Sequence, residues 1–288
     1  MQPIIPIERF EVFATGLDHP ECLALDRAGN LWAGGEGGQV YRISPAGGLQ
    51  QVACLNSFNG GIAFSPDDEL IVCNPAQGLV RVSKNGEIKL FASHAGERKL
   101  ICPNYPVYDR AGNLYVTDSG NWMKQNGALC RFTPGGKGEV IAAPFGYANG
   151  LALSSDQRTL YMVESNTDRV FQFDLSEHGA IGEHRVYAEN VGRLPDGLAL
   201  DIQGNLYASC YASDDIHRIS PRGGGGDGGG KVELFAHDRW AILLSRPTNM
   251  AFGVRDGDRD TMYVANLGRY TITRAKVGVA GQMLANQK

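Results

Sequence analysis

Short apolar runs follow one another along the whole chain and are separated by turns rich in Gly, Asn and Asp. In segment 21–32, for example, an apolar run leads into Asp26-Arg-Ala-Gly-Asn30, and a second run starts at Leu31. Gly and Asn tolerate the left-handed backbone that a tight hairpin turn requires. Apolar residues at helical spacing are nowhere sustained. The pattern therefore predicts an all-β chain built from hairpins.

This hairpin unit recurs six times, which is typical of a repeat protein. Strong copies start at Glu21, Asn104, Asn149 and Asp196, and weaker copies start at Gly60 and Thr248. Successive copies begin 39 to 52 residues apart, and several continue with a third and a fourth strand, such as 168–173 and 232–236. Four strands in a unit of roughly 40–50 residues are typical of a β-propeller blade. We therefore expect an all-β, six-bladed β-propeller of four-stranded antiparallel blades, in a single domain covering residues 1–288.

Two segments compete for the strand that completes the last blade. Glu11–Thr15 resembles a fourth strand but precedes the first inner strand. We therefore expect this N-terminal strand to pair with the last blade and close the ring, which removes exposed sheet edges. Residues 281–285 are the alternative for the same place.

Glycine is the compositional outlier, with 38 of the 288 residues. Part of the excess lies in the hairpin turns, and part lies in the run 223–230, which holds seven glycines and one aspartate. This run does not match the Gly-x-x-x-x-Gly-Lys phosphate-binding loop. We expect it to form a flexible outer hairpin loop between the third and fourth strands of the fifth blade.

Composition excludes several other classes of protein. Of all residues 43% are hydrophobic and 20% are charged, which is too apolar for a disordered chain. The formal net charge of -4, without a run of Lys and Arg, argues against a nucleic-acid partner. No apolar stretch is long enough to span a bilayer, and the first residues lack the features of a signal peptide. We therefore expect a cytoplasmic protein with neither a nucleic-acid nor a membrane partner.

The six cysteines form no C-x-x-C pair, so neither a zinc ribbon nor a thioredoxin motif is present. Most of them lie inside apolar runs, such as Leu70-Ile-Val-Cys73. We expect small buried hydrophobic residues in a reducing cytoplasm, while one disulfide stays open because sequence does not show pairing.

The residue that opens each inner strand should face the central channel, at the same height in all blades. These residues are Glu21, Gly60, Asn104, Asn149, Asp196 and Thr248. Two carboxylates in a narrow channel repel each other, which raises the pKa of one of them, and a bound cation removes that cost. Only oxygen donors are available, so the set favours a hard divalent cation, with Ca²⁺ the best fit and Mg²⁺, Mn²⁺ or Zn²⁺ less suited. The alternative is that these groups bond to one another and to water.

Polar residues also mark the ends of the second strands, which return to the same face as the channel-opening residues. They are Asn74, Asp118, Ser119, Glu164 and Asn266. We expect Asp118 to lie beside Asn104, and Glu164 should lie close to the fourth blade's channel residue in the same way. These side chains are expected to form a pocket wall, and polar strand ends without a role in binding are the alternative.

The two best-preserved repeats carry a family resemblance. The fifth blade reads Leu194-Pro-Asp-Gly-Leu-Ala-Leu200, and the fourth repeats Asn-Gly-Leu-Ala-Leu from Asn149. On these motifs the chain resembles, over nearly its whole length, the senescence marker protein/gluconolactonase family of six-bladed propellers. Members hold a divalent metal with a Glu, an Asn and an Asp, which implies Glu21, Asn149 and Asp196 as metal ligands here. The resemblance also implies that Asn104 lies near the substrate, a small molecule, and that the activity is lactone hydrolysis.

Three motifs depart from the usual pattern of that family. His19-Pro-Glu-Cys22 stands where Gly-Glu-Gly-Pro is usual. Cys102-Pro-Asn-Tyr-Pro106 replaces a basic residue followed by Asn-Asp-Gly, and Thr117-Asp-Ser119 replaces Gly-Thr-Met. Parts of the chain also resemble the strictosidine-synthase-like branch of the superfamily. These departures leave the substrate open.

The leading hypothesis is a metal-dependent hydrolase that acts on a lactone, either a sugar lactone or a similar cyclic ester. In this hypothesis Asp196 takes a proton from the attacking water, while Asn104 and Asp118 orient a substrate whose carbonyl is polarised by the cation. Participation of His19 or Glu164 in proton transfer stays open. The alternatives are an arylesterase or phosphotriesterase-type hydrolase, a strictosidine-synthase-like enzyme, and a non-catalytic binding scaffold. No Gly-x-Ser-x-Gly motif supports a serine hydrolase.

Overall fold

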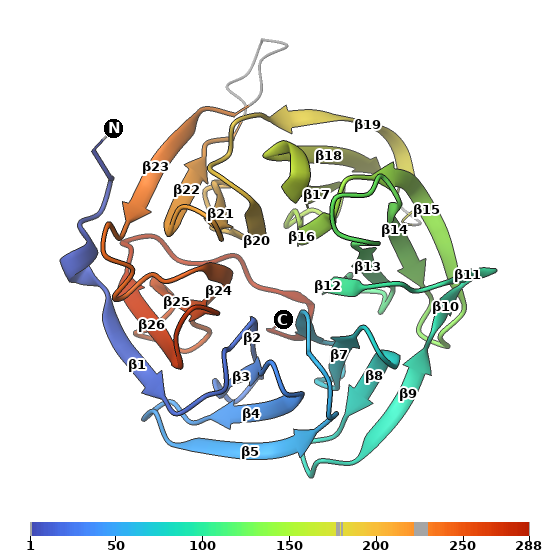
Figure 1. Cartoon of the computed structure of the whole chain (residues 1–288), viewed down its shortest axis with the longest axis horizontal. Coiled ribbons are helices and arrows are strands. Elements are labelled where there is room, and N and C mark those ends of the chain that lie inside the picture. The colour runs from blue at the N-terminus through green and yellow to red at the C-terminus, as the bar shows by residue number, and fades with distance from the viewer. Residues whose placement is uncertain (1, 177–178, 180, 222–229, 288) are drawn as a thin grey trace.

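Six four-stranded antiparallel sheets are arranged radially around a central channel (Figure 1). The computed structural model describes residues 2–176, 179, 181–221 and 230–287. Within this part of the chain the only helices are three short 3₁₀ turns, η1 (Ile7–Arg9), η2 (Ser165–Thr167) and η3 (Ala285–Gln287). The predicted all-β, six-bladed propeller is confirmed. The glycine-rich run expected to form an outer loop lies outside the described residues, apart from Gly230.

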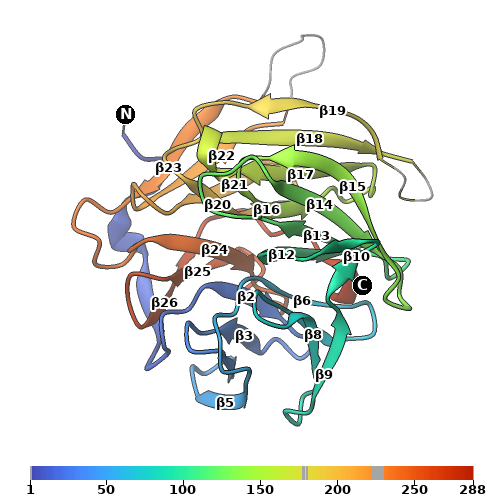
Figure 2. The same ribbon diagram turned by 45° about the vertical axis from the view of Figure 1, so that its right-hand side comes forward.

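The strands of blades 1 to 5 run in chain order from the channel outwards, and the outermost strands lie on the rim in both views (Figures 1 and 2). Blade 1 holds β2 (Cys22–Leu25), β3 (Leu31–Gly34), β4 (Gln39–Ile43) and β5 (Leu49–Cys54). Blade 2 holds β6 (Ile62–Phe64), β7 (Leu70–Asn74), β8 (Gly78–Val82) and β9 (Ile88–Ala92), and a small hairpin, β10 (His94–Ala95) and β11 (Arg98–Lys99), follows it. Blade 3 holds β12 (Pro103–Tyr108), β13 (Leu114–Asp118), β14 (Gly127–Phe132) and β15 (Gly138–Phe145).

The remaining three blades repeat the arrangement. Blade 4 holds β16 (Ala148–Leu153), β17 (Thr159–Glu164), β18 (Arg169–Leu175) and β19 (Ile181–Ala188). Blade 5 holds β20 (Pro195–Leu200), β21 (Leu206–Cys210), β22 (Asp215–Ile219) and β23 (Val232–His237). Blade 6 holds β24 (Pro247–Phe252), β25 (Thr261–Asn266) and β26 (Thr271–Lys276), and its fourth strand is β1 (Glu11–Thr15).

The predicted hairpin chemistry joins the two inner strands of blade 1. The Asp26 carboxylate accepts hydrogen bonds from the main-chain and side-chain nitrogens of Asn30, both at 2.9 Å. Between them Gly29 adopts a φ of +81°, which favours glycine. The same carboxylate accepts a hydrogen bond from Trp32 Nε1 at 3.0 Å. One aspartate therefore fixes the turn and also satisfies the polar atom of a large core side chain.

Ring closure by the N-terminal strand is confirmed. Strand β1 pairs antiparallel with β26, with Glu11 opposite Arg274 and Thr15 opposite Thr271. Residues 281–285, the alternative for this place, instead run under the ring towards the channel axis, where the C-terminus lies (Figure 1). They do not form the fourth strand of the last blade, because β1 occupies that place beside β26.

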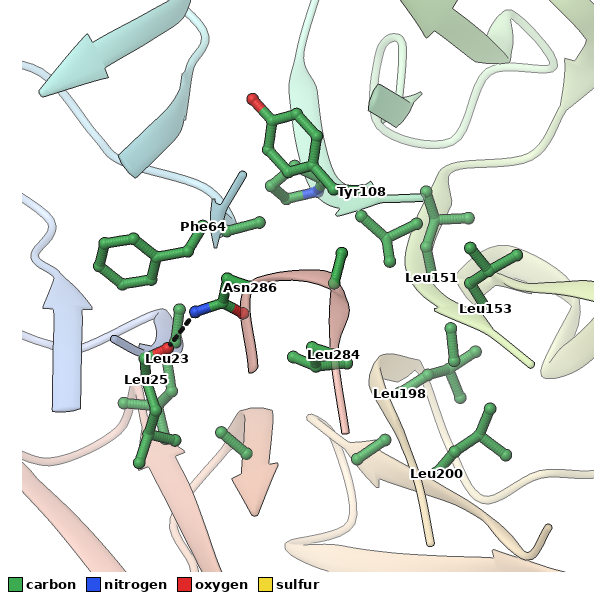
Figure 3. Close-up of a pocket in the computed structure, with 18 of the residues that line it drawn as sticks. Leu23, Leu25, Phe64, Tyr108, Leu151, Leu153, Leu198, Leu200, Leu284 and Asn286 are labelled. Carbon is green, nitrogen blue, oxygen red and sulfur yellow. Dashed lines mark hydrogen bonds between the residues drawn. The ribbon is translucent and has the colours of Figure 1, made fainter. Parts of the chain in front are cut away.

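The C-terminal segment closes the end of the channel at which the inner strands finish. Gln282 Nε2 donates to the Leu153 carbonyl oxygen at 2.7 Å, and Asn286 Nδ2 donates to that of Leu25 at 2.9 Å. Figure 3 shows Asn286 and Leu284 surrounded by leucines of several inner strands. The cavity that remains there measures only about 90 Å³ and is mostly apolar. This end of the channel therefore offers no open polar site.

Adjacent inner strands approach each other closely around the channel. A Cβ atom on Gly150 would collide with the main-chain oxygen of Asp196, and one on Gly197 would collide with that of Thr248. Only glycine fits where one backbone touches the next in this way. The glycine that follows the channel-opening residue therefore lets blades 4, 5 and 6 meet at the axis.

All six cysteines are free, and four of them are buried. No helix in the described part of the chain has the length and the apolar character that a membrane crossing requires.

Candidate functional site

A cavity of about 290 Å³ occupies the end of the channel at which the inner strands begin, and polar and apolar side chains both line it. Four of the six predicted channel residues line it, namely Glu21, Asn104, Asn149 and Asp196. Three of these side chains are buried, and Asp196 is half-buried. The other lining residues are Phe58, Trp122, Tyr147, Ser165, Leu194, Tyr211 and Leu267. The structure therefore brings together the carboxylates and amides that the repeat pattern aligns.

A β-bulge lies at the channel residue of each of blades 3 to 6. In blade 4, Ala148 faces Glu164 and Leu151 faces Met162, so Asn149 and its neighbour together oppose one residue. The inner strands of blades 3, 5 and 6 shift register in the same way. A bulge bends its strand and re-aims a side chain, and bulges are frequent beside active sites. Sequence reasoning did not predict them, although the Asn-Gly and Asp-Gly pairs inside apolar runs are a usable signal.

Left-handed residues precede four of the channel positions. Each lies two residues before the channel residue of blade 1, 4, 5 or 6; they are His19 (φ 38°), Tyr147 (φ 65°), Leu194 (φ 50°) and Arg246 (φ 48°). Such φ values are uncommon outside glycine, and for a bulky residue each costs of the order of 1–3 kcal/mol. Strained backbone persists where surrounding structure imposes it, and it clusters at functional sites. The backbone therefore takes the same left-handed conformation just before each of these four inner strands.

A short hydrogen-bond relay orients the Asn149 side chain. Its Nδ2 donates to Ser165 Oγ at 3.2 Å, and Ser165 Oγ donates to the Pro195 carbonyl oxygen of the next blade at 2.7 Å. The nitrogen side of the amide is thus held by protein. Asn149 Oδ1 is buried and has no hydrogen-bond partner. The amide oxygen of Asn149, a residue that lines the cavity, therefore accepts no hydrogen bond from the described residues.

Blade 3 repeats this relay around Asn104. Asn104 Nδ2 donates to Ser119 Oγ at 3.0 Å, and Ser119 Oγ donates to the Ala148 carbonyl oxygen at 2.6 Å. Both serines come directly after the second strand of their own blade. Their hydroxyls therefore couple the channel amide of one blade to the inner strand of the next.

Glu21 is the most strongly perturbed acid of the site. Its Oε2 is buried and has no hydrogen-bond partner, while its main-chain oxygen accepts a hydrogen bond from Thr248 Oγ1 at 2.7 Å. Burial and the nearby charge of Asp196 hold the pKa of Glu21 well above its ordinary value. Burial also raises the pKa of Asp196 to about 8, against a lowering contribution from Asn149. Two acids therefore share a site in which no Lys or Arg is found among the described lining residues.

Asp118 lies behind this cavity and does not line it. Its fully buried carboxylate accepts hydrogen bonds from Arg98 Nε at 2.9 Å and from the main-chain nitrogens of Ile101 and Cys102 at 3.1 and 2.7 Å. It therefore fixes the loop that leads into the inner strand of Asn104. In the sheet register Asp118 lies opposite Pro103, the residue before Asn104, and it is Ser119 that bonds to Asn104. The predicted contact of Asp118 with a substrate stays a prediction, and its hydrogen bonds to the loop do not favour it.

Glu164 plays the same structural part in blade 4. Its carboxylate accepts a hydrogen bond from the main-chain nitrogen of Gly146 at 2.6 Å and another from Thr167 Oγ1. In blade 6, Asn266 Oδ1 accepts one from Ser245 N at 3.0 Å. Polar residues at the ends of second strands thus tie down the loops that enter the inner strands.

His19 lies outside the channel cavity, in a neighbouring surface pocket. Its Nδ1 lies 2.9 Å from Asp18 Oδ1 and 3.1 Å from Glu36 Oε2. These three side chains are close enough to hold a cation. They are also partly exposed, and Asp18 Oδ2 already accepts hydrogen bonds from Gly37 and Gln39. Solvent-exposed acidic groups of this kind are common without a metal.

Comparison with known proteins assigns most of the chain to one family. Residues 19–268 match the family model described as the SMP-30/Gluconolactonase/LRE-like region. Lactonase drp35 of Staphylococcus saprophyticus is 27% identical over 218 residues, which cover 70% of this chain and 67% of that protein. The 6-deoxy-6-sulfogluconolactonase of Pseudomonas putida is 25% identical over 247 residues, which cover 82% of this chain and 78% of that protein.

Solved structures share the fold. The calcium-binding protein regucalcin from Agrobacterium tumefaciens superposes with a TM-score of 0.79 over 99% of this chain and 98% of its own. The two sequences are 17% identical. This likeness supports the six-bladed architecture.

Proposed function

Because the chain belongs to the SMP-30/gluconolactonase/LRE-like family, we propose that it is a lactone hydrolase, an enzyme of the carboxylic ester hydrolase class, that uses a divalent cation in the channel cavity. The relatives named lactonase and sulfogluconolactonase support the reaction class. The lining carboxylates and amides support the place of the chemistry. The substrate is accordingly a small molecule with a cyclic ester.

One observation supports the cation above all others. Glu21 Oε2 and Asn149 Oδ1 are both buried and without hydrogen-bond partners, beside the carboxylate of Asp196. Unpaired buried acceptors are costly, and a cation satisfies them together. A set made only of oxygen donors suits Ca²⁺ best, with Mg²⁺, Mn²⁺ or Zn²⁺ as the less suited ions. A cation bound to this set supplies a Lewis acid for the ester carbonyl.

Side chains of the protein accept the proton, bind the substrate and position the loop. Asp196 is the more accessible of the two acids, so it accepts the proton of the attacking water. Asn104, held through its nitrogen by Ser119, accepts a hydrogen bond from the substrate with its amide oxygen. Asp118 acts indirectly, because it holds the loop before Asn104 in place.

The test is metal content together with hydrolysis of a lactone panel. We expect the purified protein to contain about one divalent ion per chain and to lose activity with EDTA, with recovery on added Ca²⁺. Asp196→Asn should lower kcat about 10²- to 10⁴-fold, as loss of a general base does. Asp256→Asn, at an exposed position that does not line the cavity, should leave activity unchanged. A metal-free protein with full activity would overturn the proposal.

The same panel separates the alternatives. Aryl esters and phosphotriesters test the arylesterase and phosphotriesterase-type hydrolases, and a strictosidine-synthase-like enzyme would cleave none of the three substrate types. A binding scaffold predicts no hydrolysis and no change of Tm with EDTA. The cytoplasmic location stays a prediction.

A further inference from the structure

The walls of the channel cavity are apolar, in contrast to its acidic floor. Above the carboxylates and amides lie side chains contributed by blades 2 to 6 and their loops, namely Phe58, Trp122, Tyr147, Leu194, Tyr211 and Leu267. A molecule that reaches Asp196 from solvent therefore passes between aromatic and aliphatic surfaces.

The described side chains that line the cavity provide no positive charge for an anionic group on the part of the substrate that lies away from the proposed cation. The charged lining residues are Glu21 and Asp196, and no Lys or Arg is among them in the part of the chain that the structure describes. Arg246 packs against Tyr211 without lining the cavity, with Nη1 at 3.2 Å from the tyrosine hydroxyl and its guanidinium 5.4 Å from the ring centre. A carboxylate, phosphate or sulfonate would leave water here without a cation from the protein to replace it.

The walls also offer few hydrogen-bonding groups to a polyhydroxylated ring. The Tyr211 hydroxyl accepts a hydrogen bond from Arg246 and keeps its own proton to donate, while the Tyr147 hydroxyl is hydrogen-bonded with the Cys102 thiol. The Ser165 hydroxyl is used by the relay that orients Asn149. Each substrate hydroxyl that loses water without finding a partner weakens binding.

A fixed loop holds Trp122 over the cavity. Its indole ring packs edge-on against Tyr147, with ring centres 4.8 Å apart and an interplanar angle of 86°. The loop is clamped at its base, because Asn121 and Asn126 exchange two hydrogen bonds of 2.9 Å. Arg98 Nη2 donates to the Asn126 carbonyl oxygen at 2.6 Å. Even so, 51% of Trp122 stays exposed, so a wall of the cavity has apolar surface left to bury.

We propose that the substrate is an uncharged lactone with an apolar or aromatic substituent, and that Trp122 and Tyr147 bind this substituent. The proposal rests on the proposed lactone hydrolase function and narrows its substrate class. The reacting ester lies at the polar floor, and the substituent lies along the aromatic wall. Trp122 is accordingly a specificity-determining residue that does not take part in the chemical step.

The test compares δ-decalactone with D-glucono-δ-lactone as substrates of the Ca²⁺-loaded protein. We expect kcat/KM to be at least about tenfold higher for δ-decalactone. Trp122→Ala should raise KM for δ-decalactone about tenfold with little change in kcat, and Trp122→Phe should recover most of the loss. Trp240→Ala is the matched control, because Trp240 is 71% exposed and does not line the cavity.

The outcomes separate the two proposals. If D-glucono-δ-lactone is hydrolysed as well as or better than δ-decalactone, or if Trp122→Ala leaves KM unchanged, the substrate class is wrong and the lactone hydrolase stands. If neither lactone is hydrolysed by protein that binds Ca²⁺, the lactone hydrolase itself is wrong. Equal Tm values of the variants and the parent exclude a folding defect.

Discussion

The Tyr105 hydroxyl donates a hydrogen bond to the Leu198 carbonyl oxygen at 3.1 Å, across the channel from blade 3 to blade 5. Asn249 Oδ1 of blade 6 lies 3.2 Å from the same hydroxyl. Tyr105 lines the small apolar cavity at the C-terminal segment and does not line the cavity that contains Glu21 and Asp196. The buried Tyr105 side chain therefore links blades 3, 5 and 6 across the channel.

Tyr105→Phe should lower the free energy of unfolding by about 1–3 kcal/mol, because it leaves two buried acceptors without their donor. Urea denaturation measures the change. Tyr270→Phe is the control, since that ring is 57% exposed, and it should alter stability by less than about 0.5 kcal/mol. Equal effects of the two substitutions would mean that the bridge across the channel does not contribute.

Protein treated with EDTA should lose stability as pH rises from about 4 to about 8. The pKa of Asp196 is raised to about 8 in the folded protein, and an unfolded Asp titrates near 3.9. Between these values the folded state binds more protons than the unfolded state, so the free energy of unfolding falls with increasing pH. Glu21 contributes in the same direction. Urea denaturation at several pH values in this window measures the slope.

Two variants identify the groups behind that slope. Asp196→Asn should flatten it, whereas Asp256→Asn, at an exposed position, should leave it as it is in the parent. Added Ca²⁺ should stabilise most at the alkaline end of the window, where both acids give up their protons. A slope of the opposite sign in EDTA would contradict the burial of ionisable acids at this site.

Gly150→Ala should reduce both stability and activity. The new Cβ would collide with the Asp196 carbonyl oxygen, so the inner strands of blades 4 and 5 would have to separate. We expect a loss of about 1–3 kcal/mol, as for other overpacked sites, with weaker Ca²⁺ binding because Asn149 and Asp196 move apart. Gly135→Ala, whose Cβ would meet nothing closer than 3.9 Å, is the control. Thermal unfolding and Ca²⁺ titration measure both effects.

Asp118→Ala should destabilise the protein by about 3 kcal/mol, since it leaves Arg98 and two main-chain nitrogens without their acceptor. Arg98→Ala should lower kcat/KM in the same proportion as Asp118→Ala, because both release the loop before Asn104. If only the Asp118 variant loses activity while Arg98→Ala retains it, Asp118 contacts the substrate as the sequence suggested.

The six-blade repeat could be predicted from the sequence because turn residues and apolar runs recur with the same period. Asp26 and Gly29 mark the first hairpin turn, and the early position of Glu11–Thr15 indicated closure of the ring. Aligning the copies also placed Glu21 and Asp196 at one height of the channel, where they now line one cavity. Periodicity thus predicts residues that occupy equivalent positions in successive blades.

Contacts that break the repeat could not be predicted in this way. Tyr105 crosses the channel to a residue 93 positions away, and no spacing rule refers to such a pair. The carboxylate of Asp118 bonds to the loop before Asn104, because Arg98 and the main-chain nitrogens of that loop meet it there, and the repeat pattern does not align these donors. The path of residues 281–285 depends on the competition with β1 for one sheet edge.

The closure of the ring has a consequence for the order in which the protein can fold. Glu11 accepts a hydrogen bond from Arg274, which lies 263 residues later in the chain. The Leu25 carbonyl oxygen accepts one from Asn286, which lies 261 residues later. A ribosome must therefore deliver nearly the entire chain before the sixth blade gains its outer strand or the base of the channel is sealed. Contacts so distant in sequence make folding slow. Until those contacts form, the ring has no closing strand pair between β1 and β26.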